Sequence, residues 1–135
     1  MAFMEWSDEL SVGVDTFDGH HKRLIELINK LHEAMRAGKG KDVVSGVLKS
    51  LRDYTQYHFS QEEKKMIALN FSGYLEHKGQ HDNFVGKVDD CIAQYESGST
   101  TITLKLMNFL MDWLRGHIMG TDKKYQSLFA EKNVA

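Results

Sequence analysis

The sequence predicts an all-α protein, an antiparallel up-down four-helix bundle with an irregular N-terminal arm. Proline, the strongest helix breaker, is absent from all 135 residues. Apolar residues recur every three to four positions in four segments of about 20 residues, as expected for amphipathic helices. The connections between these segments are only a few residues long, which is typical of antiparallel neighbours in a helical bundle.

The N-terminal arm covers residues 1–17. Its apolar side chains lack helical spacing, so we expect them to anchor irregular structure across the bundle: Phe3, Trp6, Val12, Val14 and Phe17. The bundle itself is expected over 18–130. Since a domain typically has about 150 residues, arm and bundle together predict a single domain over 1–135.

Each predicted helix has a start or stop signal near its ends. The expected ranges are 18–37, 42–69, 74–95 and 102–120, followed by a short final piece over 121–130. The candidate signals are Thr16 or Asp18 as the first N-cap, Gly38 after the first helix, and Thr100 or Thr101 as the fourth N-cap. Short polar breaks that contain glycine separate the later helices.

Charge and composition exclude several classes of partner. The formal net charge is -2 and the pI is about 6.4, so we expect no nucleic-acid partner. No apolar run approaches the length of about 18 residues that a membrane helix needs, so membrane insertion is not expected. A single cysteine and the lack of a signal peptide favour a cytoplasmic location. A monomer is expected rather than an oligomer, and the sequence identifies no protein partner.

Ionisable residues interrupt the apolar stripes of all four predicted helices. They are His21, His58, Glu62, His77, His81 and His117. A single core histidine is usually structural, but this joint pattern would bury a carboxylate among imidazoles, which is costly unless a metal neutralises it. The residues fall near the start, end, start and end of successive antiparallel helices, so they share one layer. The sequence therefore predicts a metal site at one end of the bundle core.

Four segments resemble bacterial members of the hemerythrin family, and the resemblance covers nearly the whole chain. They are Val-Gly-Val-Asp-Thr-Phe-Asp-Gly-His-His-Lys (12–22), His-Phe-Ser-Gln-Glu-Glu-Lys-Lys-Met (58–66), His-Lys-Gly-Gln-His (77–81) and Trp-Leu-Arg-Gly-His-Ile-Met-Gly-Thr-Asp (113–122). The resemblance implies a non-haem di-iron site in the bundle core. The implied ligands are His77, His81 and His117 on one iron, His21 and His58 on the other, and Glu62, Asp122 and an oxo or hydroxo group as bridges.

The resemblance also implies reversible dioxygen binding, for oxygen storage, delivery or transport, and no enzymatic activity. It places four residues around the oxygen pocket: Phe59, Trp113, Leu114 and Ile118. Periodicity alone would assign these four to the ordinary core. The implied open coordination position is on the iron held by His21 and His58.

Other functions stay open at this point. A sensor of dioxygen or redox state would need a separate partner, since the chain is too short to add an output domain. A di-iron oxidase, a peroxidase or an enzyme that handles nitric oxide is a third possibility. The histidine-rich ligand set argues against strong oxygen activation, which usually accompanies carboxylate-rich sites. Metal buffering is a fourth, because these ligands also accept zinc, manganese or cobalt.

Other polar residues near the site are expected to lie outside the ligand set. His20 and Glu63 each point about 100° away from the neighbouring ligand, and we expect Glu63 to be solvated. His32 and Cys91 lie about 15 Å or more along their helices from the nearest predicted ligand, so they are expected to be structural.

The spacing of the last two ligands makes a further prediction about the backbone. His117 and Asp122 are five residues apart, so a regular helix would point them about 140° from one another. Both must face the metals. We therefore expect a π-like turn or a break between them, near Gly120.

Overall fold

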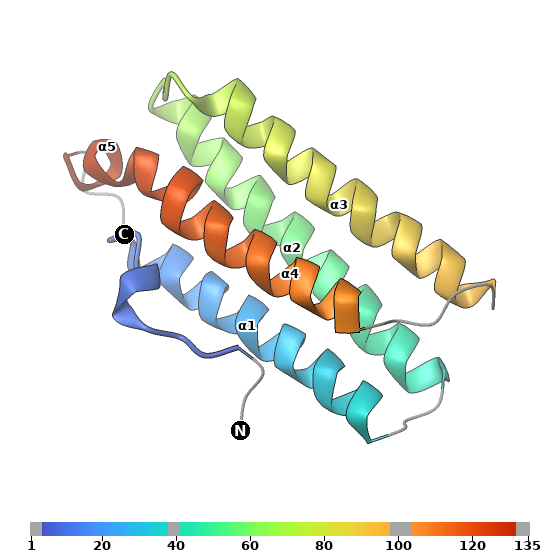
Figure 1. Cartoon of the computed structure of the whole chain (residues 1–135). Helices are drawn as coiled ribbons and strands as arrows, with labels where there is room; N and C mark the ends of the chain where they lie inside the picture. The colour runs from blue at the N-terminus through green and yellow to red at the C-terminus, as the bar shows by residue number, and fades with distance from the viewer. Residues whose placement is uncertain (1–3, 38–40, 98–103, 132–135) are drawn as a thin grey trace.

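Four long helices alternate in direction and form a bundle (Figure 1). The computed structural model describes residues 4–37, 41–97 and 104–131. Within these ranges the long helices are α1 (Asp15–Arg36), α2 (Lys41–Ala68), α3 (Tyr74–Glu96) and α4 (Leu104–Gly116). The all-α, up-down fold class predicted from the sequence is confirmed, and the described helix ends lie within about three residues of the predicted ones, as is usual for such boundaries, except at the end of α4.

The C-terminal end of α4 changes its helical type three times. A π-helical turn, η2 (His117–Thr121), follows α4 directly and leads into the 3-10 helix η3 (Asp122–Tyr125). A last short helix, α5 (Gln126–Glu131), closes the described chain. The expected π-like turn around Gly120 is therefore confirmed.

The described part of the arm before α1 is irregular, as predicted, except for the short 3-10 helix η1 (Asp8–Leu10). The predicted end of the arm at residue 17 is wrong, because α1 begins at Asp15 and includes Phe17. The apolar side chains of the arm are buried against the bundle: Met4, Leu10, Val12 and Val14. Asn29 of α1 fixes the arm through two hydrogen bonds of 2.7 Å, one to the backbone nitrogen of Met4 and one to its carbonyl oxygen.

The predicted capping of α1 is wrong in detail. Its N-cap is Val14, and within the described residues no side chain caps the helix there. The Asp18 carboxylate instead accepts hydrogen bonds from the backbone nitrogen of Val12 at 2.8 Å and from the hydroxyl of Ser11 at 2.6 Å. Asp18 therefore fastens the arm to the start of α1. The other capping and arm residues predicted above, Phe3, Gly38, Thr100 and Thr101, lie outside the described residues.

A left-handed asparagine ends α2 and turns the chain into α3. Asn70 has a φ of 55°, a conformation that asparagine adopts more readily than most residues. Its backbone nitrogen donates to the carbonyl of Ile67, and that of Phe71 donates to the carbonyl of Met66, which together form a Schellman motif. This tight turn places the last turns of α2 beside the first turns of α3.

Apolar side chains from all four long helices fill the bundle. Fully buried examples are Leu31 of α1, Leu48 of α2, Val88 of α3 and Leu110 of α4. Among the described residues, no helix combines the length and the hydrophobicity needed to span a bilayer.

Candidate metal centre

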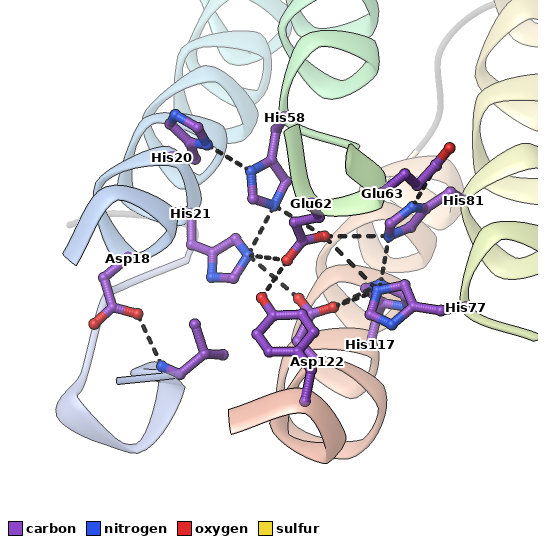
Figure 2. Close-up of polar contacts among 12 residues, drawn as sticks. Asp18, His20, His21, His58, Glu62, Glu63, His77, His81, His117 and Asp122 are labelled. Atoms are coloured by element: carbon purple, nitrogen blue, oxygen red, sulfur yellow. Dashed lines mark hydrogen bonds and ion pairs between the residues drawn. The ribbon is translucent and has the colours of Figure 1, made fainter. Parts of the chain in front are cut away.

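Seven buried residues meet at the end of the bundle where α1 and α3 begin and α2 and α4 end (Figure 2). None of them has more than 4% of its surface exposed: His21, His58, Glu62, His77, His81, His117 and Asp122. The structure thus brings together every predicted ligand, and the expectation that they share one layer is confirmed. Asp122 belongs to η3, and the π-helical turn before it aims its carboxylate at the same centre as His117.

Within the described residues, the seven form two overlapping groups whose donor atoms lie within 4.8 Å of one another. One group contains three histidines and two carboxylates: Glu62, His77, His81, His117 and Asp122. The other contains two histidines and the same two carboxylates: His21, His58, Glu62 and Asp122. Both carboxylates therefore lie between the two sets of imidazoles, where each can reach two ions.

Imidazole nitrogens crowd one another at the centre. The Nε2 atoms of His21 and His58 are 2.9 Å apart, and that of His117 lies 2.9 Å from Nε2 of His81 and 3.1 Å from Nε2 of His77. Two donors at right angles on one ion, each about 2.1 Å from it, are about 3 Å apart. The observed separations therefore fit neighbouring ligands of a common ion.

The carboxylate oxygens are equally close to these nitrogens but poorly directed for hydrogen bonding. Oδ1 of Asp122 lies 2.8 Å from Nε2 of His77 and 3.0 Å from Nε2 of His117. Even so, within the described part of the chain, both Asp122 oxygens and Oε1 of Glu62 lack a hydrogen-bond partner of acceptable geometry. Unsatisfied buried oxygens are costly, and cations coordinated by them would remove the cost.

The protein's own groups favour ionised carboxylates at this centre. Burial opposes ionisation of Glu62, yet the charge and contacts of His58, His77 and His81 hold its pKa well below the usual value. Burial and Glu62 both oppose ionisation of Asp122, but His117 and His21 still lower its pKa strongly. The donor set thus presents two negative charges to a cation.

The pKa shifts of four of these histidines differ in direction, depending on their neighbours. Burial works against protonation of His21 and His77, but Asp122 and Glu62 together outweigh it, so the pKa of His21 is raised and that of His77 rises to about 9. At His58 and His117 burial outweighs the effect of the nearby carboxylates, and the pKa is lowered. Because a metal ligand must be a neutral imidazole, metal binding has to displace the proton of His77 and competes with protonation of His21.

Two of the candidate ligand histidines have a carboxylate or amide partner on the side away from the centre. Nδ1 of His81 lies 2.9 Å from the Glu63 carboxylate, and Nδ1 of His117 lies 2.8 Å from Oε1 of Gln80. The hydroxyl of Thr121 donates to the same Gln80 oxygen at 2.8 Å. The expectation that Glu63 is solvated is wrong, because its side chain is only 18% exposed and reaches across to α3. Such outer contacts fix the orientation of a metal-binding imidazole.

Tyr125 is a site residue that the sequence analysis missed. It is fully buried, and its hydroxyl donates a hydrogen bond to Oε2 of Glu62. Burial, Asp122 and Glu62 raise the pKa of the Tyr125 phenol well above its usual value, so it remains a donor. The sequence did contain a signal for it: Tyr125 follows Asp122 by three residues, and that spacing places both side chains on the same face of a helix.

The comparisons with known proteins agree with this geometry. A sequence model described as the Hemerythrin HHE cation binding domain matches residues 12–129. The chain belongs to the hemerythrin family. The bacteriohemerythrin of Stenotrophomonas maltophilia strain R551-3 is 34% identical over 125 residues, which cover 93% of this hemerythrin and 80% of that protein.

Another relative and a solved structure agree over similar lengths. The bacteriohemerythrin of Methylococcus capsulatus strain Bath is 32% identical over 126 residues, covering 93% of this chain and 95% of that protein. A crystal structure of a wild-type hemerythrin matches this fold with a TM-score of 0.87 at 31% identity, covering 93% of this chain and 97% of that one.

Two of the four residues predicted to line an oxygen pocket in this hemerythrin stack on candidate ligand histidines, and the other two are buried beside them in the sequence. Phe59 stacks on His81 with 3.6 Å between ring centroids, and Trp113 stacks on His117 with 4.4 Å. Leu114 is 4% exposed and Ile118 is fully buried. Phe59, Trp113 and Leu114 line a small apolar cavity, whereas Ile118 does not. The cavity has a volume of about 10 Å³ for the centre of a water-sized molecule, which is close to the minimum for one such molecule.

His20, His32 and Cys91 belong to neither donor group among the described residues, as expected. His32 and Cys91 are half-buried and lie toward the other end of the bundle. His20 is buried beside His58, where burial, reinforced by the neighbouring histidines, lowers its pKa to about 4.

Proposed function

We propose that this hemerythrin binds two iron ions and, through them, dioxygen reversibly, for oxygen storage, delivery or transport. The observation that carries the proposal is the pair of donor groups that share Glu62 and Asp122. The donor types alone would accept other divalent metals, and family membership supports iron. When bound, a pair of ferrous ions would supply the electrons for reversible dioxygen binding.

The proposed ligand roles follow from the two groups. His77, His81 and His117 would hold one ion, and His21 and His58 the other. Glu62 and Asp122 would join both ions, with a solvent-derived oxo or hydroxo group as a further bridge. The His21 and His58 group offers one imidazole fewer, so an open position for a small ligand would be on the ion that this group holds.

The apolar walls explain how the site could take up a gas and exclude water. The cavity lies about one helical turn from the ligand layer, since Leu24 and Leu114 are each three residues from a candidate ligand, and apart from Thr55 it is lined by apolar side chains, among them Phe59. An apolar diatomic molecule loses little solvation on entering such a space, whereas water or an anion would lose its hydrogen bonds. Leu114 and Ile118 flank His117, three residues before it and one after it, and would shield it from solvent.

We infer a binding protein rather than an enzyme. Five imidazoles and two carboxylates make a histidine-rich set, and strong oxygen activation usually accompanies carboxylate-rich di-iron sites. We also propose that residues 1–135 act as a single domain, because the donor groups draw on α1, α2, α3 and the turns that directly follow α4.

Iron content and optical spectra test the proposal. The reduced protein should bind two iron ions per chain, gain a visible absorption band in air, and lose it when the dissolved gas is removed. Asp122→Ala should lose iron, and Asp112→Ala, an exposed aspartate on α4, should retain it. Steady consumption of a reductant in air, without a reversible band, would show an enzyme instead.

A further inference from the structure

His20 makes a contact with the centre that the ligand set does not explain. Its exposed fraction is 9%, and its Nδ1 lies 2.8 Å from Nδ1 of His58 (Figure 2). The other nitrogen of the His58 ring, Nε2, faces the centre and lies 3.4 Å from Oε1 of Glu62. The two rings therefore meet on the side of His58 that points away from the centre.

Packing holds the His20 ring in this place. Ring centroids of Tyr54 and Tyr57 lie 5.9 and 5.4 Å from that of His20, and the ring of Phe17 lies 5.9 Å away. These neighbours come from both α1 and α2, so the imidazole is enclosed on several sides. A side chain enclosed in this way keeps its orientation at low entropic cost.

A metal on Nε2 of His58 determines which nitrogen carries the hydrogen. Nε2 then uses its lone pair for the ion, and the neutral imidazole keeps its hydrogen on Nδ1. If Nδ1 of His20 also carried a hydrogen, two donors would face one another at 2.8 Å. His20 must therefore present an unprotonated Nδ1 and carry its own hydrogen on Nε2.

We propose that His20 is a positioning residue of the metal centre, whose Nδ1 accepts a hydrogen bond from Nδ1 of His58 and fixes the orientation and tautomer of that ligand. The inference rests on the proposed function, because it requires a metal ion on His58. It extends a pattern, since His81 and His117 already have outer partners in Glu63 and Gln80, whereas among the described residues Nδ1 of His21 and of His77 has none. At His58 the partner is a neutral imidazole rather than a carboxylate or an amide.

Nitrogen NMR of the zinc-loaded protein tests the direction of the hydrogen bond. Zinc is diamagnetic and accepts the same nitrogen and oxygen donors. With ¹⁵N-labelled histidine, Nδ1 of His58 should be protonated and Nδ1 of His20 unprotonated, with a scalar coupling between the two nitrogens. A hydrogen on Nδ1 of His20, or no coupling in protein that holds two zinc ions, would overturn the proposal.

Three variants test whether the contact matters for metal binding. His20→Phe keeps an aromatic ring but removes the acceptor, and His20→Gln keeps an acceptor. Loss of an outer partner typically costs 10- to 100-fold in metal affinity. His20→Phe should therefore lower the affinity for one of the two ions by that factor. His20→Gln should recover most of the loss. His32→Phe, on the same helix but outside both donor groups, should match the parent.

The measurement is competition with a chelator for cobalt, whose visible spectrum also reports the coordination of the weakened ion. Circular dichroism checks that each variant folds, and if His20→Phe does not, the NMR result and His20→Gln decide. Unchanged affinities and an unchanged cobalt spectrum in folded His20→Phe would overturn the role of His20 alone. A parent protein that binds no pair of metal ions would instead overturn the proposed function.

Discussion

Nε2 of His117 lies 3.0 Å from Oδ1 of Asp122, although five residues separate the two along the chain. A regular α-helix would turn about 500° over that interval and point the two side chains apart. The π-helical turn from His117 to Thr121 widens the helix locally, and both side chains face the same centre. A single wide turn of this kind often marks a functional site. Here it directs the carboxylate of Asp122 to the centre that already contains Glu62.

The π-helical turn should not depend on the glycine within it. A Cβ atom added at Gly120 would meet nothing within 4 Å, whereas Gly13 has a φ of 75° that disfavours other residues. Gly120→Ala should therefore leave the free energy of unfolding unchanged or raise it by about 0.5–1 kcal/mol. Gly13→Ala should lower it by about 1–2 kcal/mol. Urea unfolding measures both, and a destabilised Gly120→Ala would show that the turn does require glycine.

Removal of the metals should destabilise the site end of the bundle. Glu62 and Asp122 are fully buried in one centre, so without cations their charges are balanced only by the surrounding imidazoles. With metal at about 100 times its dissociation constant, binding adds about 2.7 kcal/mol, which corresponds to about 10 °C in Tm. Melting curves before and after chelation measure this effect.

Hydrogen exchange locates the destabilisation. After chelation, amides near His58 and His77 should lose protection, while those near Leu31 and Leu48, at the other end, should keep it. Equal melting temperatures with and without metal would argue against the buried centre as a binding site for cations.

Most of the fold and most of the buried donor cluster could be predicted because their signals are local and periodic, whereas Asp122 was predicted from the family resemblance. His58 and Glu62, and likewise His77 and His81, repeat at four residues within apolar stripes, which reports a shared buried face. The absence of proline and the short breaks indicated the antiparallel bundle. The five-residue spacing of His117 and Asp122 even located the π-helical turn.

The contacts that sequence reasoning missed depend on side-chain reach between helices. Glu63 points away from Glu62 around α2, yet its length lets it cross to His81 of α3. Asp18 has the residue type of an N-cap, but the path of the arm brings Val12 and Ser11 to its carboxylate. Periodicity predicts which face of its own helix a side chain occupies. It does not predict which residue of another helix or loop that side chain will contact.

Loss of the Tyr125 hydroxyl should weaken the fold and leave the ring packing intact. The hydroxyl donates to the buried Glu62 carboxylate, while the ring stacks against His77 and Phe129. Because a hydrogen bond to a charged group contributes about 1.5–3 kcal/mol, Tyr125→Phe should lower the free energy of unfolding by about that amount. Tyr57→Phe is the control, since Tyr57 is 52% exposed and should change by less than about 0.5 kcal/mol. Equal unfolding curves for the two variants would contradict a structural role for this hydroxyl.

Cys91 should react slowly with alkylating reagents at neutral pH. Burial, with a smaller contribution from Asp90, raises the pKa of its thiol, and Lys87 offsets this only in part. Since the thiolate is the reactive form, a raised pKa lowers its fraction at every pH below that value. The rate with iodoacetamide should therefore climb at a higher pH in the folded protein than in urea, where the pKa is about 8.5. Identical pH profiles in the two states would show that Cys91 is freely solvated.

Truncation of Leu114 should shorten the lifetime of the oxygenated protein. Leu114 is 4% exposed and lines the apolar cavity one helical turn from His117, so Leu114→Ala would enlarge the cavity and admit water. The substitution should cost about 2–5 kcal/mol of unfolding free energy, as is usual for buried leucines. Water or an anion that reaches the irons favours irreversible oxidation, so the visible band formed in air should fade faster, with iron content unchanged.

Leu110→Ala is the matched control for this prediction. Leu110 is fully buried one turn earlier on α4, and it does not line the cavity. Its truncation should reduce stability to a similar degree but leave the decay of the visible band close to that of the parent. If the two variants decay equally fast, lower stability rather than access to the centre sets the lifetime. If neither differs from the parent, another side chain controls the approach of solvent, and Ile118, buried next to His117, is the next position to truncate.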